Sequence, residues 1–329
     1  MSAQFKALSQ TRRHNGPNGM VTNLSSLGFQ FENEADLKST VERLAKNAVA
    51  GLAVSEGDYR IWRSRTGAEL WFHVASGSAT ADTVGDDIER EIIGLTPFFE
   101  GVSSVDVTLE AGFSRPGDNA FEGGFQAWVA DPEVPPPPAK NGLDQANSTD
   151  DADDIDGSYP IVFDCVDYAA HTAIDLPKRC AVRLIGFARE VAVFDNLESF
   201  EKTQKQRPHE MADRAFFPVG MFAAAQAGLD SAASQTGVNP TATPPSALDD
   251  GAALGSNPPS ANALFTGHII DCQEFVNEET QKKFYWLNVD SLDARYDVVA
   301  DPECLSGTPK TGAIAQVACV MFGRILGTT

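Results

Sequence analysis

Two tryptophans stand among charged residues in a predicted β-hairpin, with the sequence DYRIWR at 58–63 and ELWFHV at 69–74. We expect Arg63 to pair with Ala68, so that alternate residues of each strand face opposite sides of the hairpin. One side then carries apolar side chains for the core: Tyr59, Ile61, Leu70, Phe72 and Val74. The other side carries Asp58, Arg60, Trp62, Glu69, Trp71 and His73, with Asp58 opposite His73.

A charged sheet face that bears two tryptophans is typical of a binding surface, because tryptophan and arginine dominate the energetics of interfaces. The sequence therefore predicts a surface for a protein or a ligand, formed by Arg60, Trp62, Glu69, Trp71 and His73. In the competing interpretation, both tryptophans pack in the core beneath a helix, and Asp58 and His73 form a surface pair.

Glu69 and His73 also suggest metal chemistry, because carboxylate and imidazole groups are ordinary ligands of zinc and iron. Both lie on the same face of one strand, so they could share a metal ion. In this alternative the chain is a metal-dependent enzyme that holds one divalent transition metal on its N-terminal sheet. The leading hypothesis requires no cofactor.

Two short patterns recur in the C-terminal half of the chain. Asp164 in IVFDCVDY and Asp271 in HIIDCQEF occupy matching positions, and so do Arg189 and Arg295 in ARE-VAVFD and ARY-DVVAD. The aspartates either mark the end of a strand or meet across an interface to bind a cation or share a proton. Each arginine either supports a loop by pairing with the aspartate that follows it or grips an anionic ligand.

These recurrences predict an internal duplication, with copies at 158–222 and 264–329, because ordered matches at a nearly constant offset indicate a repeat. Each copy contains short strands punctuated by glycine and proline, which favours a small barrel-like β unit. The residues at 20–132 instead mix a strand, a helix capped by Asn33 and the hairpin, which predicts a two-layer α/β sandwich. The expected fold class is therefore α+β.

Three segments look like connections rather than folded parts. The residues at 1–19 predict a flexible N-terminus. Those at 133–157 form a proline-rich and acidic linker, and those at 223–263 form a linker rich in Ala, Gly, Ser and Pro.

Charge and composition narrow the classes of partner. The chain has 329 residues, with 46 acidic against 25 basic residues and a formal net charge of −21, so nonspecific binding to nucleic acid has no electrostatic driving force. No apolar run is long enough to span a bilayer, and no export signal is recognised, so we expect a soluble cytoplasmic protein. The 5 cysteines lack metal-binding spacing and are expected to be reduced, with Cys165 and Cys319 buried in strands.

The leading functional hypothesis is a non-enzymatic protein-interaction module, such as an adaptor, an assembly component or an immunity-type inhibitor, with a protein partner that is basic. The chain contains none of the common nucleotide-binding, zinc-protease or hydrolase motifs. The metal-dependent enzyme is the second hypothesis. The third is an OB-like binder of single-stranded nucleic acid, with Phe284, Tyr285 and Trp286 as stacking residues.

Overall fold

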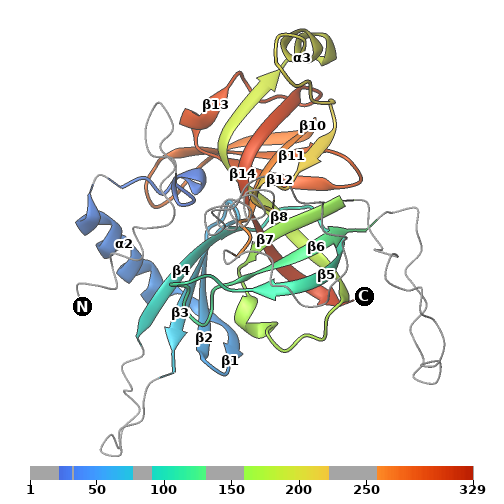
Figure 1. Ribbon diagram of the computed structural model, residues 1–329. Helices are drawn as coiled ribbons and strands as arrows, with labels where there is room; N and C mark the ends of the chain where they lie inside the picture. Colours follow the sequence, from blue (N-terminus) through green and yellow to red (C-terminus); the bar gives the residue numbers. More distant parts are fainter. Residues whose placement is uncertain (1–21, 32, 77–90, 131–158, 222–257, 329) are drawn as a thin grey trace, which may run out of the picture.

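A computed structural model describes residues 22–31, 33–76, 91–130, 159–221 and 258–328 of the chain (Figure 1). This part is mostly β-strand and contains two sheets, a 4-stranded sheet and a 10-stranded sheet, with few helices. The architecture is broadly consistent with the predicted α+β class. None of the helices in these ranges is long and apolar enough to cross a membrane. The predicted segments 1–19 and 133–157 lie outside the described ranges, as does most of 223–263.

The N-terminal part places one helix beside the smaller sheet. Its elements in chain order are η1 (Ser25–Leu27), α2 (Glu34–Asn47), β1 (Val49–Val54), β2 (Gly57–Arg63), β3 (Ala68–Ala75) and β4 (Ile92–Phe99). The strands follow one another in the sheet as β1-β2-β3-β4. The predicted cap of α2 is confirmed, because the Asn33 side chain accepts a hydrogen bond from the Asp36 amide at 2.9 Å. The strand expected before this helix is instead the 3-10 turn η1.

The register of the β2–β3 hairpin differs by one residue from the predicted one. Arg63 pairs with Glu69 and Tyr59 with His73, because Ser64 and Ala68 face each other and close the turn with three residues between them. Gly67 takes a left-handed φ of 89°, and the Ser64 amide donates to the Ala68 carbonyl at 2.8 Å. A shift of one residue moves each side chain of one strand to the other face. The predicted grouping of faces is therefore wrong.

In the observed register, Glu69, Trp71 and His73 share their face with Tyr59 and Ile61. Each of these side chains is buried, as is Trp62 on the opposite face. The expectation of an exposed binding surface on this hairpin is therefore corrected: β2 and β3 are mostly buried on both faces. The interpretation in which both tryptophans lie in the core describes the structure.

The second sheet contains the remaining strands. They are β5 (Val105–Phe113), β6 (Gly124–Val129), β7 (Tyr159–Cys165), β8 (Lys178–Phe194), β9 (Ala215–Phe217), β10 (Asn262–Val276), β11 (Lys283–Asp290), β12 (Arg295–Ala300), β13 (Leu305–Ser306) and β14 (Ile314–Thr328). Short helices lie between them, including η2 (Tyr168–Ala170), α3 (Leu197–Gln204) and η3 (Pro302–Cys304). Because β5 and β6 pair with β8 and β7, the residues predicted as one N-terminal sandwich are divided between both sheets.

The long strands β8 and β14 pair antiparallel through the middle of the molecule, and the sheet closes on both sides of them (Figure 1). One ring runs through β8, β5, β6, β7 and β14. The other runs through β14, β10, β11, β12 and β8. The two rings share β8 and β14 and so form one continuous sheet, rather than the small barrel-like unit expected for each copy from the sequence.

Both rings repeat one pattern of pairing. Each ring contains a three-strand antiparallel meander. The first strand of the meander pairs with the long strand that follows that meander in the chain, β5 with β8 and β10 with β14. The third strand of each meander pairs in parallel with the long strand that follows the other meander, β7 with β14 and β12 with β8. A bulge interrupts β5 after Leu109 and β10 after Ile269 at matching places.

The register between the long strands identifies equivalent residues. Phe187 pairs with Val320 and Phe322 pairs with Ile185, so each phenylalanine lies opposite the residue two positions before the other one. Arg189 and Arg324 each lie two residues after the phenylalanine of their own strand. By this pairing Arg189 corresponds to Arg324 and not to Arg295. The duplication predicted at 158–222 and 264–329 stays unconfirmed, since the repeated pattern runs over β5–β8 and β10–β14.

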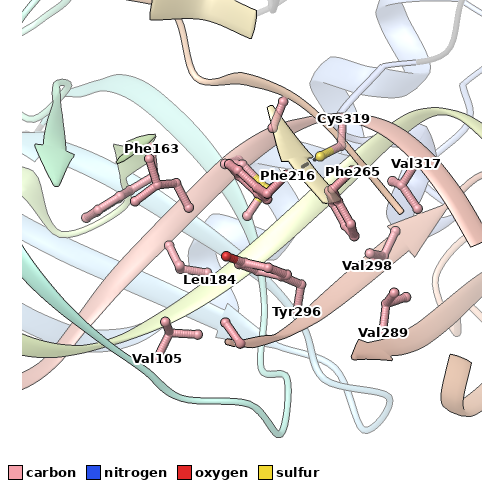
Figure 2. Packing of buried hydrophobic residues seen from close by; sticks show 14 of the residues in the cluster. Val105, Phe163, Leu184, Phe216, Phe265, Val289, Tyr296, Val298, Val317 and Cys319 are labelled. Carbon is pink, nitrogen blue, oxygen red and sulfur yellow. Dashed lines mark hydrogen bonds between the residues drawn. The ribbon is translucent and has the colours of Figure 1, made fainter. Parts of the chain in front are cut away.

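The two faces of the larger sheet bury separate apolar clusters. One cluster gathers inward side chains of both rings, and Figure 2 shows Phe216, Phe265 and Tyr296 close together within it, with ring centroids 5.2–5.8 Å apart. The other cluster joins the outer face to the 4-stranded sheet, and there Phe187 and Phe322 pack edge to face at 4.9 Å. The smaller sheet therefore sits over the place where the rings meet.

Candidate functional site

A cavity of about 420 Å³ lies between the free edge of β4, the loop from β5 to β6, and the shared strands β8 and β14. β4 pairs only with β3 among the described strands, so its other edge faces this cavity. The charged side chains of its wall are Arg115, Asp118, Glu122, Asp164 and Arg189. A concave site of this size with several convergent polar groups is the usual form of a small-ligand site.

The β5–β6 loop holds its own shape through hydrogen bonds. The Arg115 amide donates to the Asp118 side chain at 2.7 Å, and the Asn119 amide donates to the Glu122 side chain at 3.1 Å. Gly117 lies between them with a left-handed φ of 94°, which glycine adopts without strain. Side-chain acceptors of this kind stabilise tight turns, so the loop positions its polar groups before any ligand arrives.

His73 lies behind the cavity wall and contacts two residues that line it. Its Nδ1 is 3.3 Å from Asn119 Nδ2, and its Nε2 is 3.3 Å from Thr96 Oγ1. Asn119 Oδ1 is occupied, because it accepts from the Phe121 amide at 2.9 Å. Asn119 therefore presents its NH₂ group, Nδ1 of His73 is the acceptor, and the ring proton sits on Nε2.

This tautomer excludes His73 as a general base for Thr96. An Nε2–H donates to the threonine hydroxyl and cannot accept its proton. Complete burial also lowers the pKa of His73 to about 3, since the imidazolium would lose its hydration. Glu122 lies 3.9 Å from Nδ1, and its pKa is raised by burial. The ring is therefore neutral, and this contact is not an ion pair.

A second grouping has residue types found in thiol enzymes. The Cys165 thiol donates to Asp167 Oδ1 at 3.1 Å, while His171 Nε2 lies 3.2 Å from Asp167 Oδ2. The aspartate therefore separates the thiol from the imidazole, which could not deprotonate it directly. Burial and the neighbouring carboxylate raise the pKa of Cys165 well above its ordinary value, so the thiol is unreactive.

The two arginines of the cavity have different partners. Arg115 forms an ion pair with Asp164 at 2.6 Å and also donates to the Pro259 carbonyl. Within the part of the chain that the structure describes, Arg189 donates only to uncharged oxygens, those of Asn23, Phe187 and Ala188. The cavity therefore contains one neutralised and one uncompensated guanidinium group.

The predicted metal ligands are already occupied by protein partners. Glu69 accepts from Arg63 Nε and from Trp71 Nε1, each at 2.7 Å, and Arg324 NH1 lies 3.5 Å away. His73 is held by Asn119 and Thr96 as described above. No group of three or more metal-ligating side chains occurs within the described ranges. Glu69 and His73 therefore do not fit a metal site in this arrangement.

The other predicted residues lie apart from one another. Arg60 is partly buried on β2 opposite Phe72, with Trp62 on the same face. Asp164 faces the cavity on β7, whereas Asp271 is exposed at the β10 bulge. Arg295 is exposed, with Nε 3.5 Å from Asp290. Of the predicted residues, the cavity wall includes only Asp164 and Arg189.

The aromatic residues suggested for nucleic-acid stacking are also accounted for. Phe284 and Trp286 are buried between the sheets, and Trp286 Nε1 donates to the buried Asp297 at 2.8 Å. Tyr285 donates its hydroxyl to Glu274 at 2.7 Å. Base stacking needs exposed rings, so this strand offers no stacking platform.

Sequence reasoning missed Thr96, Arg115, Asn119 and Glu122 as site residues. The Pro-Gly-Asp-Asn sequence at 116–119 signals a turn, which is the one local indication of this loop. Nothing in the turn indicates that it faces β4.

Comparisons of this chain with protein-family models, with curated proteins and with solved structures found no match. Its function is therefore inferred from geometry alone.

Proposed function

We propose that this chain is a non-enzymatic protein-interaction module of the cytoplasm and that it docks its partner along the free edge of β1. The observation that carries the proposal is the exposure of this strand. Every residue of Val49–Val54 is apolar, and all but the last are exposed. β1 pairs only with β2 among the described strands.

An exposed and uncharged edge strand is a liability in an isolated protein. It presents unpaired amide and carbonyl groups to any other strand, and natural proteins usually protect such edges with charged residues or proline. β1 has neither, although Val49 is 58% exposed and Leu52 is 41% exposed. Addition of a strand from a partner would pair these backbone groups and cover the apolar side chains.

Charge favours a basic partner. The chain carries a formal net charge of −21, and the exposed Glu56 lies two residues after the end of β1. Asp58 lies opposite Ala53 on the neighbouring strand. A field of this sign steers positively charged partners and raises their association rate. The proposed occupant is therefore an extended segment of a partner protein in which basic and apolar residues alternate.

The test uses synthetic peptides about ten residues long, a length that covers an ordinary strand. A peptide of alternating valine and lysine should bind the full chain in a fluorescence-polarisation titration. A peptide with glutamate in place of lysine should not bind. A valine–lysine peptide with N-methyl groups along one edge keeps its charge and loses its backbone donors, so it should not bind either.

A matched pair of protein variants locates the site. Leu52→Lys places a charge on the β1 edge and should weaken binding of the valine–lysine peptide by at least about tenfold, or 1.4 kcal/mol. Leu292→Lys places the same charge at an exposed position between β11 and β12 and should leave binding unchanged. Equal binding of the N-methylated peptide would refute strand addition. If the protein alone dimerises through β1, the strand that occupies this edge comes from a second copy of the chain and not from a partner protein.

A further inference from the structure

Arg189 and Arg324 occupy equivalent positions on the two shared strands, and their surroundings differ in one respect. Arg324 NH1 lies 3.5 Å from the buried carboxylate of Glu69, which the smaller sheet supplies. At Arg189 the N-terminal part supplies only the amide oxygen of Asn23. No carboxylate of the described residues lies within ion-pair distance of Arg189. The carboxylate present beside one arginine is therefore missing beside the other.

The surroundings of Arg189 do not compensate its charge in another way. Burial lowers the pKa of Arg189, which shows that its charged form is partly desolvated. The nearby thiols of Cys304 and Cys319 have their pKa raised to about 12 by burial, so they are uncharged. A partly buried guanidinium that has no counter-charge among the described residues is costly, and such a group gains from an anion.

Arg189 lines the cavity and has donors that are not fully used by the described residues. Its NH1 contacts the carbonyls of Phe187 and Ala188 at 3.5 and 3.4 Å, which are long for hydrogen bonds, and its NH2 donates to Asn23. None of the described residues accepts a hydrogen bond from its Nε. Arg115, in contrast, is neutralised by Asp164 at 2.6 Å and does not compete for the anion.

We propose that Arg189 binds the carboxylate of a small ligand in the cavity, in the role that Glu69 has at Arg324. Asp118 and Glu122 lie in the same cavity wall and disfavour ligands with several negative charges, which makes a monocarboxylate the fitting class. Thr96 and Asn119 supply uncharged polar groups for the rest of the ligand. The carboxylate belongs either to a free organic acid or to the C-terminus of a peptide.

This proposal is independent of the β1 edge, since the cavity lies at β4 on the other side of the smaller sheet. Either proposal can fail while the other stands. The peptides designed for β1 carry amidated C-termini in that test, so they present no carboxylate to the cavity.

The experiment is a calorimetric titration of the full chain with a fixed set of probes. The set comprises butyrate, benzoate, N-acetylglycine, a tetrapeptide with a free C-terminus, the same tetrapeptide as its C-terminal amide, and inorganic phosphate. At least one monocarboxylate should bind, and phosphate and the amide should not. Binding of the free tetrapeptide alone identifies a chain end as the ligand, and binding of the small acids identifies a free metabolite.

Arg189→Gln should weaken the affinity for the probe that binds by at least about tenfold, because a hydrogen bond to a charged group contributes more than 1.4 kcal/mol. Arg295→Gln removes an exposed arginine outside the cavity and should leave the affinity unchanged. If Arg189→Gln does not fold, Arg189→Lys keeps the charge and serves to assign the Arg189 Nε–H resonance by its absence. That resonance should shift when the probe is added to the unaltered protein.

Two results would overturn the proposal. One is that no monocarboxylate of the set binds. The other is that a probe binds with the same affinity to the Arg189→Gln variant or without any shift of the Arg189 resonance.

Discussion

Asn119 fixes the tautomer of His73. Its Nδ2 lies 3.3 Å from Nδ1 of the imidazole, and its Oδ1 is held by the Phe121 amide, so the amide group cannot be reversed without losing a hydrogen bond. The ring is stacked on Phe121 with centroids 5.2 Å apart and is completely buried. A histidine that the sequence suggests as a metal ligand or a surface residue is therefore a neutral structural group.

The first prediction concerns stability and pH. The pKa of His73 is lowered to about 3 in the folded protein, against about 6.5 in the unfolded chain. Below pH 6.5 the His73 side chain binds a proton in the unfolded chain but stays neutral in the folded protein. His73 therefore lowers the free energy of unfolding as the pH falls from 6.5 toward 3. Between pH 7 and 5 the expected loss is about 2 kcal/mol, measured by urea unfolding at each pH.

The control for this prediction is a pair of variants. His73→Gln should flatten the dependence of unfolding free energy on pH in that window, whatever its stability at pH 7. His209→Gln changes an exposed histidine and should keep the slope of the unaltered protein. A His73→Gln variant with an unchanged slope would show that His73 titrates normally.

The second prediction concerns the tryptophans of the hairpin. Trp62 is 7% exposed and packs edge-on to Phe29, while Trp71 is 2% exposed and packs against Tyr59. Each substitution to alanine should lower the unfolding free energy by about 3–5 kcal/mol, because it opens a large cavity. Leu197→Ala, at an exposed position on α3, should change it by less than about 1 kcal/mol. Small effects of both tryptophan substitutions would mean that this hairpin is exposed after all.

The third prediction concerns the contact between Glu69 and Arg324, which joins the two sheets. Glu69 is completely buried and receives hydrogen bonds from Trp71 and Arg63. Glu69→Ala should cost about 3–5 kcal/mol, because it leaves the partly buried Arg324 without its counter-charge. Chemical denaturation monitored by circular dichroism provides the measurement. A loss below about 1 kcal/mol would show that the ion pair does not hold the sheets together.

The fourth prediction concerns Gly94, which lies on the β4 edge beside the cavity. A Cβ atom at this position would collide with His73 Nδ1 and Asn119 Nδ2. Gly94→Ala should therefore displace the Asn119 side chain and destabilise the protein by about 1–3 kcal/mol. Gly327→Ala on β14, where a Cβ meets nothing within 4 Å, is the matched control. Equal thermal stability of both variants would contradict the close packing behind the cavity.

Local sequence signals predicted α2 and the presence of the β2–β3 hairpin. The Asn33 cap indicates α2, and alternating residues indicate the hairpin. The predicted hairpin register was wrong because Gly67 adopts a left-handed φ and the turn closes with Ser64, rather than Arg63, opposite Ala68. Since side chains alternate along a strand, this shift of one residue reverses the predicted faces.

The cavity could not be predicted in the same way, because its walls come from distant parts of the chain. Thr96 is on β4, Arg115 is in the loop after β5, and Arg189 is on β8. The parallel contacts of β7 with β14 and of β12 with β8 bring these parts together, and no local pattern encodes them. The sequence pattern matches Arg189 with Arg295, whereas the strand pairing relates Arg189 to Arg324.

The most direct test of the proposed interaction is hydrogen–deuterium exchange at the β1 edge. The amides of Val49–Val54 that point away from β2 should exchange fast in the free protein and become protected when the valine–lysine peptide is added, because a strand that pairs with this edge occupies these backbone groups. The N-methylated peptide should give no protection. Unchanged exchange of β1 at a saturating concentration of the valine–lysine peptide would contradict docking at this edge.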